Sequence, residues 1–220
     1  MRNSASRILL ARETETGELL KADMARHLPP AGTYQCLDPL CGGDLNVCQW
    51  PRRPGHFYFR HRTATASANC GFHCGNARTQ RRHDAAQHLL AVVLNEAIHY
   101  REPMPLLEFQ VAGATRHVLP LLNAKKVVPE WACTRTGRRA DIALLDGRDE
   151  PVLIIEVFHT HAVDRNKARD YSDYWWVEVE ANAIIAEYER LPVIHCGNLP
   201  YGLAPETQQR CLPGVSRREW

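Results

Sequence analysis

Several features are missing from this chain, and each absence narrows its class. No apolar run in the 220 residues approaches the roughly 18 that a membrane-spanning helix needs. The first residues carry only a short apolar patch, Ile8 to Ala11, which is shorter than the core of a secretory signal peptide. The sequence also has no internal repeat and no low-complexity segment. We therefore expect a globular, cytoplasmic protein that does not associate with membranes.

A strong charge imbalance is also missing, because the formal net charge is only +2. A value this small does not indicate a nucleic-acid partner by itself. Arginines do gather in short clusters, at Arg52 and Arg53, Arg60 and Arg62, Arg78, Arg81 and Arg82, and Arg138 and Arg139. Each cluster alone is typical of an ordinary solvated surface.

What the chain has in quantity is cysteine, with eight residues. In a reducing cytoplasm cysteines serve as metal ligands or core residues rather than as disulfides. Residues 34–75 crowd cysteine, histidine, glycine and proline together, and their apolar residues show no long period. We expect such a segment to bury little apolar surface, so that something other than a core must order it.

Cys36 and Cys41 are separated by four residues, which is within the spacing of a zinc knuckle. Gly42 and Gly43 follow and would ease the turn. Further candidate ligands lie downstream, at His56, His61, Cys70, His73 and Cys74. We favour a tetrahedral zinc site made by Cys36, Cys41, His61 and Cys70, with Cys74 as the alternative to Cys70. The competing interpretation is a set of buried cysteines and surface histidines without a metal.

The second half of the sequence shows regular periodicity. Apolar residues recur at three- and four-residue steps from Arg78 to Tyr100, which predicts a helix. Residues 106–131 are ambiguous and fit two strands. Strands are then expected at 140–145, 152–157 and 175–181, with a turn-rich loop at 146–151 and a short helix at 162–174. We predict a boundary after residue 77, a second domain over 78–196, and a C-terminal tail over 197–220.

The two strands at 140–157 carry a pair of carboxylates. If the loop 146–151 is symmetric, Asp146 opposes Pro151, and counting outward places Asp141 opposite Glu156. Directly opposed residues on antiparallel strands have Cβ atoms roughly 4.5–5.5 Å apart on one face of the sheet. Two carboxylates so placed repel each other unless a divalent cation such as Mg²⁺ lies between them. The competing interpretation is a glutamate that reaches solvent or forms a salt bridge with Arg138 or Arg139.

These residues resemble a known bacterial family. The pattern GRRADIALLDGRDEPVLIIEVFHTHAVDRNKARDY, followed by WWVEVEA, is similar to the nuclease region of CoiA-like competence proteins, which belong to the PD-(D/E)xK superfamily. The preceding YQCLDPLCGGDL, HFYFRH and RRHDAAQHLL also look like that family's layout. The resemblance covers roughly residues 7–181 and implies an α/β (α+β) fold, a restriction-endonuclease-like mixed sheet flanked by helices, after a small zinc-binding module.

The resemblance also implies site residues. Asp141 and Glu156 would be catalytic ligands of Mg²⁺ or Mn²⁺, with the Val157 carbonyl as a third ligand. The superfamily often has a lysine where this chain has Phe158. Because the superfamily is known to move that lysine to a neighbouring helix, Lys167 is the candidate replacement.

The implied activity is metal-dependent hydrolysis of phosphodiester bonds in DNA, with RNA as the alternative substrate, in DNA uptake, recombination or defence. The residues expected to contact nucleic acid are Arg78, Arg81, Arg82, Arg138, Arg139 and His161. Phe158 favours an alternative, an inactive zinc-containing nucleic-acid-binding protein of nuclease fold. A third interpretation is a zinc-stabilised protein-interaction module.

Overall fold

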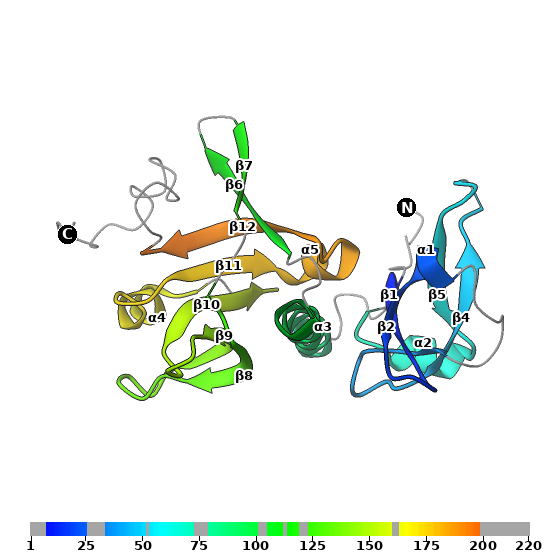
Figure 1. Ribbon diagram of the computed structural model, residues 1–220, viewed down its shortest axis with the longest axis horizontal. Coiled ribbons are helices and arrows are strands. Elements are labelled where there is room, and N and C mark those ends of the chain that lie inside the picture. Colours follow the sequence, from blue (N-terminus) through cyan, green and yellow to red (C-terminus); the bar gives the residue numbers. More distant parts are fainter. Residues whose placement is uncertain are drawn as a thin grey trace. The chain divides into compact units, whose positions relative to one another are not determined.

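The computed structural model describes residues 8–25, 34–51, 53–72, 79–100, 105–111, 114–118, 123–159 and 163–198. The chain divides into two compact units, Met1–Leu89 and Leu90–Trp220. Helix α3, Thr79–Tyr100, runs across this division (Figure 1). The boundary expected after residue 77 therefore stays a prediction, and the expected tail lies outside the described residues beyond Asn198.

The first unit is built on a five-stranded antiparallel sheet in the order β2-β1-β3-β4-β5. Its strands are β1 (Leu10–Glu13), β2 (Leu19–Lys21), β3 (Tyr34–Gln35), β4 (Asp44–Gln49) and β5 (Phe57–His61). Its short helices are α1 (Ala22–Ala25) and α2 (Ala64–Asn69). Ile8, just before β1, forms a bridge with Phe59 of β5, so the outer strand β5 also pairs with the segment that leads into β1. The expected hairpin at the start of the chain is confirmed by the pairing of β1 with β2.

The first unit has a core of its own. Tyr34, Leu45, Phe59 and Phe72 are each at most 2% exposed, and the Tyr34 and Phe59 ring centroids are 5.1 Å apart. The expectation that residues 34–75 bury little apolar surface was therefore wrong. The strands here have only two to six residues, so too few apolar residues alternate in each strand for a period to be visible in the sequence.

The second unit contains a seven-stranded mixed sheet in the order β7-β6-β12-β11-β10-β9-β8 (Figure 1). Its strands are β6 (Leu106–Val111), β7 (Ala114–Val118), β8 (Lys126–Ala132), β9 (Arg139–Leu145), β10 (Pro151–Phe158), β11 (Trp176–Glu180) and β12 (Arg190–Gly197). The pairs β10–β11 and β12–β6 are parallel, and the others are antiparallel. The fold is thus mixed α+β. The strands expected at 140–145, 152–157 and 175–181 are confirmed, and residues 106–131 form parts of three strands rather than two.

The helices α3, α4 and α5 lie in the segments of the chain that connect strands. The helix expected from Arg78 to Tyr100 is confirmed as α3, and the periodic residues Ala86, Leu89, Leu90, Val93 and Ala97 are all buried. Helix α4 (Arg165–Asp170) lies in the connection between the parallel strands β10 and β11, and α5 (Ala181–Ala186) packs against β11 and β12. The helix expected over 162–174 is shorter than predicted, because the Asp164 side chain accepts a hydrogen bond from Lys167 N and caps the helix there.

Helix α4 is held to the sheet by a small apolar cluster. Ala168 and Tyr171 pack with Ile154 of β10 and Trp176 of β11. A parallel pair of strands needs such a crossover, and burial of its apolar face fixes it to the sheet. The chain just after β10 is thereby brought back over the strands that carry the carboxylates.

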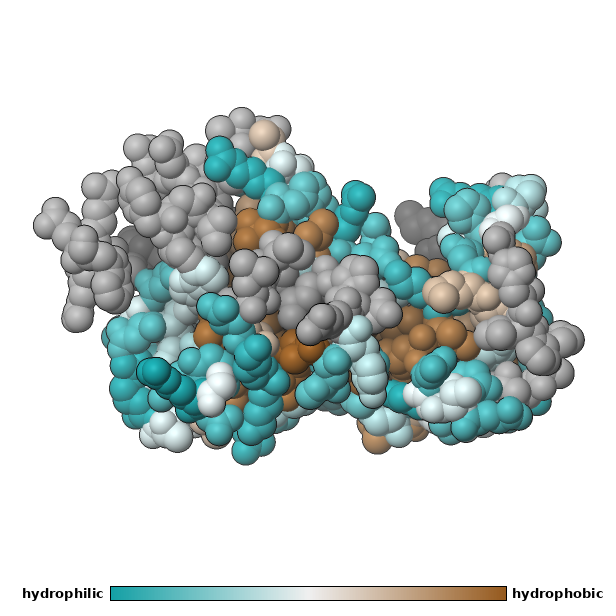
Figure 2. Space-filling view, in the orientation of Figure 1, coloured by the Kyte–Doolittle hydropathy of each residue, from teal (hydrophilic) through white to brown (hydrophobic). Residues whose placement is uncertain are grey.

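In the view of Figure 2 the side chains around the β8–β9 end of the sheet are mostly hydrophilic, in agreement with the exposed charged residues Lys126, Arg135 and Arg138. None of the described helices combines the length and the apolar character needed to cross a membrane.

The fold makes a prediction at Gly197, which pairs with Trp176 across β11 and β12. A Cβ atom at Gly197 would lie 2.2 Å from Trp176 Nε1, and that indole is 2% exposed. Gly197→Ala should therefore lower the free energy of unfolding by roughly 1–3 kcal/mol, the usual cost of overpacking. Denaturant unfolding monitored by tryptophan fluorescence measures it.

Gly147→Ala is the matched control. Gly147 lies in the β9–β10 loop, is not among the residues with positive φ, and has no atom within 4 Å of its virtual Cβ. This change should leave stability equal or raise it by up to about 1 kcal/mol, because alanine restricts the unfolded chain. Equal stability losses in the two variants would contradict the prediction.

Candidate functional site

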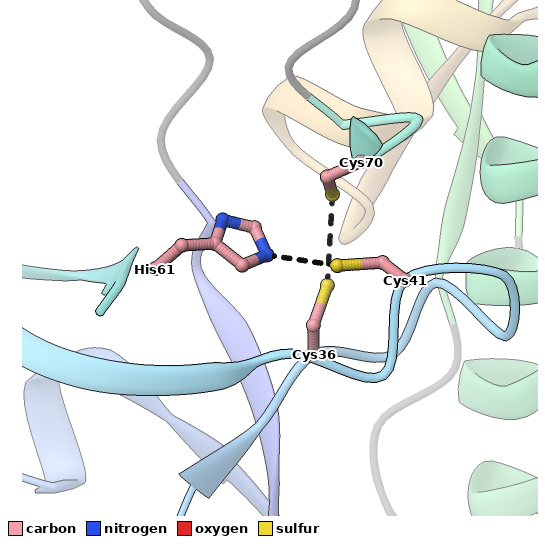
Figure 3. A group of neighbouring side chains, drawn as sticks. All are labelled: Cys36, Cys41, His61 and Cys70. Carbon is pink, nitrogen blue, oxygen red and sulfur yellow. Dashed lines mark hydrogen bonds between the residues drawn. The ribbon is translucent and has the colours of Figure 1, made fainter. Parts of the chain in front are cut away.

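Four side chains of the first unit converge on one point. Cys36, Cys41, His61 and Cys70 each place a ligand atom within 4.8 Å of the others (Figure 3). The Cys36 and Cys70 Sγ atoms are 3.7 Å apart, and Cys41 Sγ lies 3.1 Å from His61 Nε2. A tetrahedral zinc with Zn–S bonds of about 2.3 Å separates its sulfur ligands by roughly 3.8 Å. The cluster can therefore hold a metal such as zinc, and its members are the four ligands favoured from the sequence.

Local structure explains how the ligands meet. Cys36 and Cys41 flank a tight turn in which Cys41 N and Gly42 N both donate to the Asp38 carbonyl, and Gly42 adopts φ +53°. His61 ends β5, and α2 then leads to Cys70. The Asp38 carboxylate is 3% exposed and accepts from Gly71 N at 2.6 Å. This buried hydrogen bond ties the turn to the segment that carries Cys70.

In the absence of a metal, the surroundings of the cluster favour neutral thiols and a neutral imidazole. Burial raises the pKa of the Cys41 thiol, and the hydrogen bond with Cys36 together with burial raises that of Cys70. Burial lowers the pKa of His61, which keeps the imidazole in the neutral form that binds metals. A bound cation reverses the balance for the thiols, because thiolate is the form that binds a metal.

The other cysteines that the structure describes lie outside this cluster. Cys48 faces away from it on β4, opposite Tyr58. Cys133 is buried near Tyr174, and Cys196 lies on β12. Cys74, the predicted alternative ligand, lies outside the described residues, as does Cys211.

The second candidate site lies on the central strands of the second unit. Leu153, Ile154 and Ile155 of β10 pair with Leu144, Ala143 and Ile142 of β9, and the same register continues to Glu156 opposite Asp141. The route to this register differs from the one predicted. Pro151 pairs with Leu145 rather than Asp146, and the register then shifts by one residue before Leu153. The loop is therefore not symmetric about Asp146 and Pro151, and an extra residue, Val152, restores the expected alignment.

Glu156 is a buried charge with several partners. It is 4% exposed. Its Oε2 accepts from Lys167 Nζ at 2.6 Å and its Oε1 from the Tyr171 hydroxyl at 3.0 Å. Asp141 is partly exposed, and its Oδ2 accepts from Val157 N at 2.7 Å. Burial and then the Asp141 charge raise the pKa of Glu156 to about 7, although Lys167 and Tyr171 act in the opposite direction.

Arg138 and Arg139, which the sequence offers as salt-bridge partners of Glu156, both pair with other residues. Arg138 pairs with Asp170 and Arg139 with Glu130, so neither forms the salt bridge to Glu156, and Glu156 does not reach solvent. That interpretation was wrong, because helix α4 brings Lys167 to the carboxylate instead. Arg81 and Arg82 lie on α3, where an Arg82 Nη atom donates to the Phe72 carbonyl. Arg78 and His161 lie outside the described residues.

Sequence reasoning missed three polar neighbours. Tyr171 contacts Glu156, and on β11 and β12 Glu178 forms a pair with His195. The spacing of Lys167 and Tyr171, four residues apart, is a helical signal that places both on one face of α4. The alignment of Glu178 with Glu156 depends on the register of a parallel pair, which no local pattern reveals.

Comparison of the chain with protein-family models, with curated proteins and with solved structures finds no match. The resemblance to CoiA-like proteins therefore rests on the residues quoted from the sequence.

The raised pKa of Glu156 predicts a pH dependence of stability. Because the folded pKa of about 7 exceeds the ordinary value of 4.5, this group favours folding fully below about pH 4.5, and its contribution is lost as the pH rises through about 7. Relative to the wild type, Glu156→Gln should gain stability between these pH values. Thermal unfolding in a chelator measures the difference.

Glu150→Gln, in the exposed β9–β10 loop, is the control and should show no such gain. A Glu156→Gln variant whose stability relative to the wild type is the same at both ends of this pH range would contradict the prediction.

Proposed function

We propose that this chain is a metal-dependent DNA nuclease whose active site is formed by Asp141, Glu156 and Lys167. The observation that carries the proposal is the approach of Lys167 Nζ to within 2.6 Å of Glu156 on the strand where Phe158 replaces the usual lysine. The Lys167 side chain is 23% exposed, so it is not an ordinary solvated helix lysine. A cation beside two opposed carboxylates suits metal-assisted hydrolysis of a phosphodiester.

The order of elements supports the proposal. Helix α3, strands β8, β9 and β10, helix α4 and strand β11 follow one another along the chain, with the β6–β7 hairpin between α3 and β8. This arrangement agrees with the restriction-endonuclease-like core that the resemblance implies. The two carboxylates lie on its central strands, and the lysine lies on the crossover helix.

The donor set suits a hard cation. Asp141, Glu156 and the Val157 carbonyl would hold Mg²⁺ or Mn²⁺, and oxygen ligands are those that these ions prefer. Each carboxylate oxygen has two lone pairs, so the hydrogen bonds to Glu156 leave acceptor capacity. When bound, a divalent ion would neutralise charge on the scissile phosphate and lower the pKa of a bound water.

Lys167 would act on the attacking water and on the phosphate, beside the carboxylates Asp141 and Glu156. Its ammonium group would orient the attacking water and offset the negative charge that develops on the phosphate. Tyr171 would hold the other Glu156 oxygen and so fix the carboxylate's direction. Lys167 lies on the short helix α4, and Tyr171 is the residue that ends it.

The Cys₃His cluster would stabilise the protein, and a set of arginines with His161 would bind the nucleic acid. We propose that the Cys₃His cluster holds a structural zinc, which would stabilise the loop ends of the first unit. Arg78, Arg81 and Arg82, with Arg138, Arg139 and His161, would contact the nucleic acid, mainly its phosphates, which gives affinity without sequence information. Reduced thiols at a zinc site are consistent with a cytoplasmic location.

A second candidate is an inactive nucleic-acid-binding protein of the same fold. It is favoured by the engagement of both Glu156 oxygens, by Lys167 and Tyr171, in a buried position. A protein that shifts DNA at low salt but leaves plasmid intact in Mg²⁺ and in Mn²⁺ would support this candidate over the enzyme.

The zinc proposal predicts about one equivalent of zinc in the purified protein. Cys36→Ser combined with Cys41→Ser removes two of the four ligands, so this variant should lose the metal and the part of the first unit's thermal stability that the metal supplies. Elemental analysis and circular dichroism measure the two effects. Cys48→Ser is the control and should keep the metal. A folded wild type with less than about a tenth of an equivalent of zinc would overturn the proposal.

The active-site proposal predicts that the wild type nicks or linearises plasmid with Mg²⁺ and that EDTA stops it. Asp141→Ala and Glu156→Ala should abolish cleavage in a protein that stays folded. Lys167→Ala should lower the single-turnover rate by about 10²–10³-fold, the scale of losing a transition-state donor. Lys167→Arg should recover only part, because a planar guanidinium does not replace an ammonium group.

Lys126→Ala is the control for the lysine. Lys126 is exposed and pairs with Asp149 on the same sheet, and its loss should leave the rate unchanged. A Lys167→Ala rate within about threefold of the wild type would remove Lys167 from the site, and wild-type rates in both carboxylate variants would refute the site altogether.

A further inference from the structure

A second buried carboxylate lies beside the first. Glu178 of β11 is 1% exposed and pairs in parallel register with Glu156 of β10. Neighbouring residues in register point to the same face of a sheet, and strands are about 4.8 Å apart. Glu178 nevertheless has its own partners, because its Oε1 accepts from Val163 N at 2.6 Å and its Oε2 contacts His195 Nδ1 at 2.5 Å.

A register shift in β12 places the histidine. Val193 pairs with Val179, whereas His195 pairs with Glu178, so Ile194 is an extra residue between the two pairs. Without it, Ile194 would oppose Glu178 and the imidazole would turn to the other face. Such bulges are frequent where a strand re-aims a side chain. Asp141, Glu156, Glu178 and His195 consequently form one row across four adjacent strands, β9 to β12.

The hydrogen bonds of Glu178 decide which histidine nitrogen carries the proton. A carboxylate oxygen accepts hydrogen bonds, and we therefore assign the N–H of this contact to His195 Nδ1. In the neutral imidazole Nε2 then holds the lone pair. The His195 side chain is 46% exposed while Glu178 is 1% exposed. The pair thus has the arrangement of a carboxylate that orients an imidazole base.

The geometry points to His195 as the general base of the proposed nuclease, with Glu178 as the residue that positions it. The inference rests on the proposed function. Nε2 would take a proton from the attacking water as its oxygen bonds to phosphorus. The bond from phosphorus to the leaving oxygen breaks with its electron pair on that oxygen, which takes a proton from solvent. Lys167 keeps its part in orienting the water and offsetting charge.

A purely structural pair would behave differently. In that case Glu178 and His195 would only tie β12 to the segment before α4 through Val163, and substitution would change stability without a specific effect on the chemical step. The second unit holds such a pair for comparison. Glu108 and His117 also oppose each other across two strands, β6 and β7, at 3.4 Å, and they lie outside the row.

The first arm of the test reads the tautomer directly, without any activity. In ¹⁵N NMR of the full chain, with assignment by His195→Ala, neutral His195 should be protonated at Nδ1. Glu178→Gln should reverse it. Val163 N requires an oxygen at its side of the amide, so the amide NH₂ group faces Nδ1, which must then accept. A wild-type His195 protonated at Nε2 would overturn the inference.

The second arm measures single-turnover plasmid cleavage at saturating Mg²⁺. His195→Ala should lower the rate by about 10²-fold or more, the scale of general-base catalysis, with substrate affinity nearly unchanged, and Glu178→Gln should also lower it. Added imidazole should restore at least a tenth of the wild-type rate to His195→Ala but none to Glu156→Ala. His117→Ala should cut at the wild-type rate.

The outcomes separate the two proposals. If the wild type cuts and His195→Ala cuts within threefold of it, or imidazole gives no rescue to a folded His195→Ala, the general-base assignment is wrong while the nuclease stands. If the wild type does not cut with any divalent ion tested, the proposed function fails and the assignment fails with it, even where the tautomer is as expected.

Discussion

The burial of Glu156 in the middle of a mixed sheet is the constraint on which the second unit depends. A carboxylate taken out of water without partners costs several kcal/mol. The chain meets this cost with groups from one short helix, since Lys167 and Tyr171 of α4 both donate to Glu156. Asp164 starts the helix, and Tyr171, packed on Ile154 and Trp176, ends it where both donors reach the strand.

The first unit combines a small apolar core with a Cys₃His cluster. Its strands are short, yet Tyr34, Leu45 and Phe59 give it an apolar centre. The bridge between Ile8 and Phe59 connects β5 back to the segment that leads into β1. The Cys₃His cluster therefore does not replace a core. It lies beside that core, where Asp38 joins the turn at Cys41 to the chain at Gly71. Four soft or neutral ligands in a buried place suit zinc, whereas the opposed carboxylates of the second unit suit a harder ion.

How much the sequence could predict depends on the range of the interaction. Helix α3 and the strands β9, β10 and β11 follow from local periodicity, and the pair Cys36 and Cys41 follows from its spacing. The density of candidate ligands downstream indicated His61 and Cys70 as the other members of the cluster. The alignment of Asp141 with Glu156 was predicted from a loop symmetry that the structure does not have; the register shift before Leu153 compensates for the error. The partnership of Glu178 with His195 could not be predicted, because it needs the order of strands and a second bulge. The core of the first unit was missed since its strands are too short to show a period.

The position of β12 in the sheet has a consequence for synthesis. This strand lies between β6 and β11, and it is the last described strand in the sequence. On a ribosome the chain emerges from its N-terminal end, so the β6–β7 hairpin and the block β8 to β11 are made before the strand that joins them. Until residues 190–197 emerge, β6 and β11 each keep an open edge, the kind of surface to which chaperones and other nascent chains bind. The strand that carries His195 is thus also the one that completes the sheet, which delays the assembly of the polar row until translation of this region has finished.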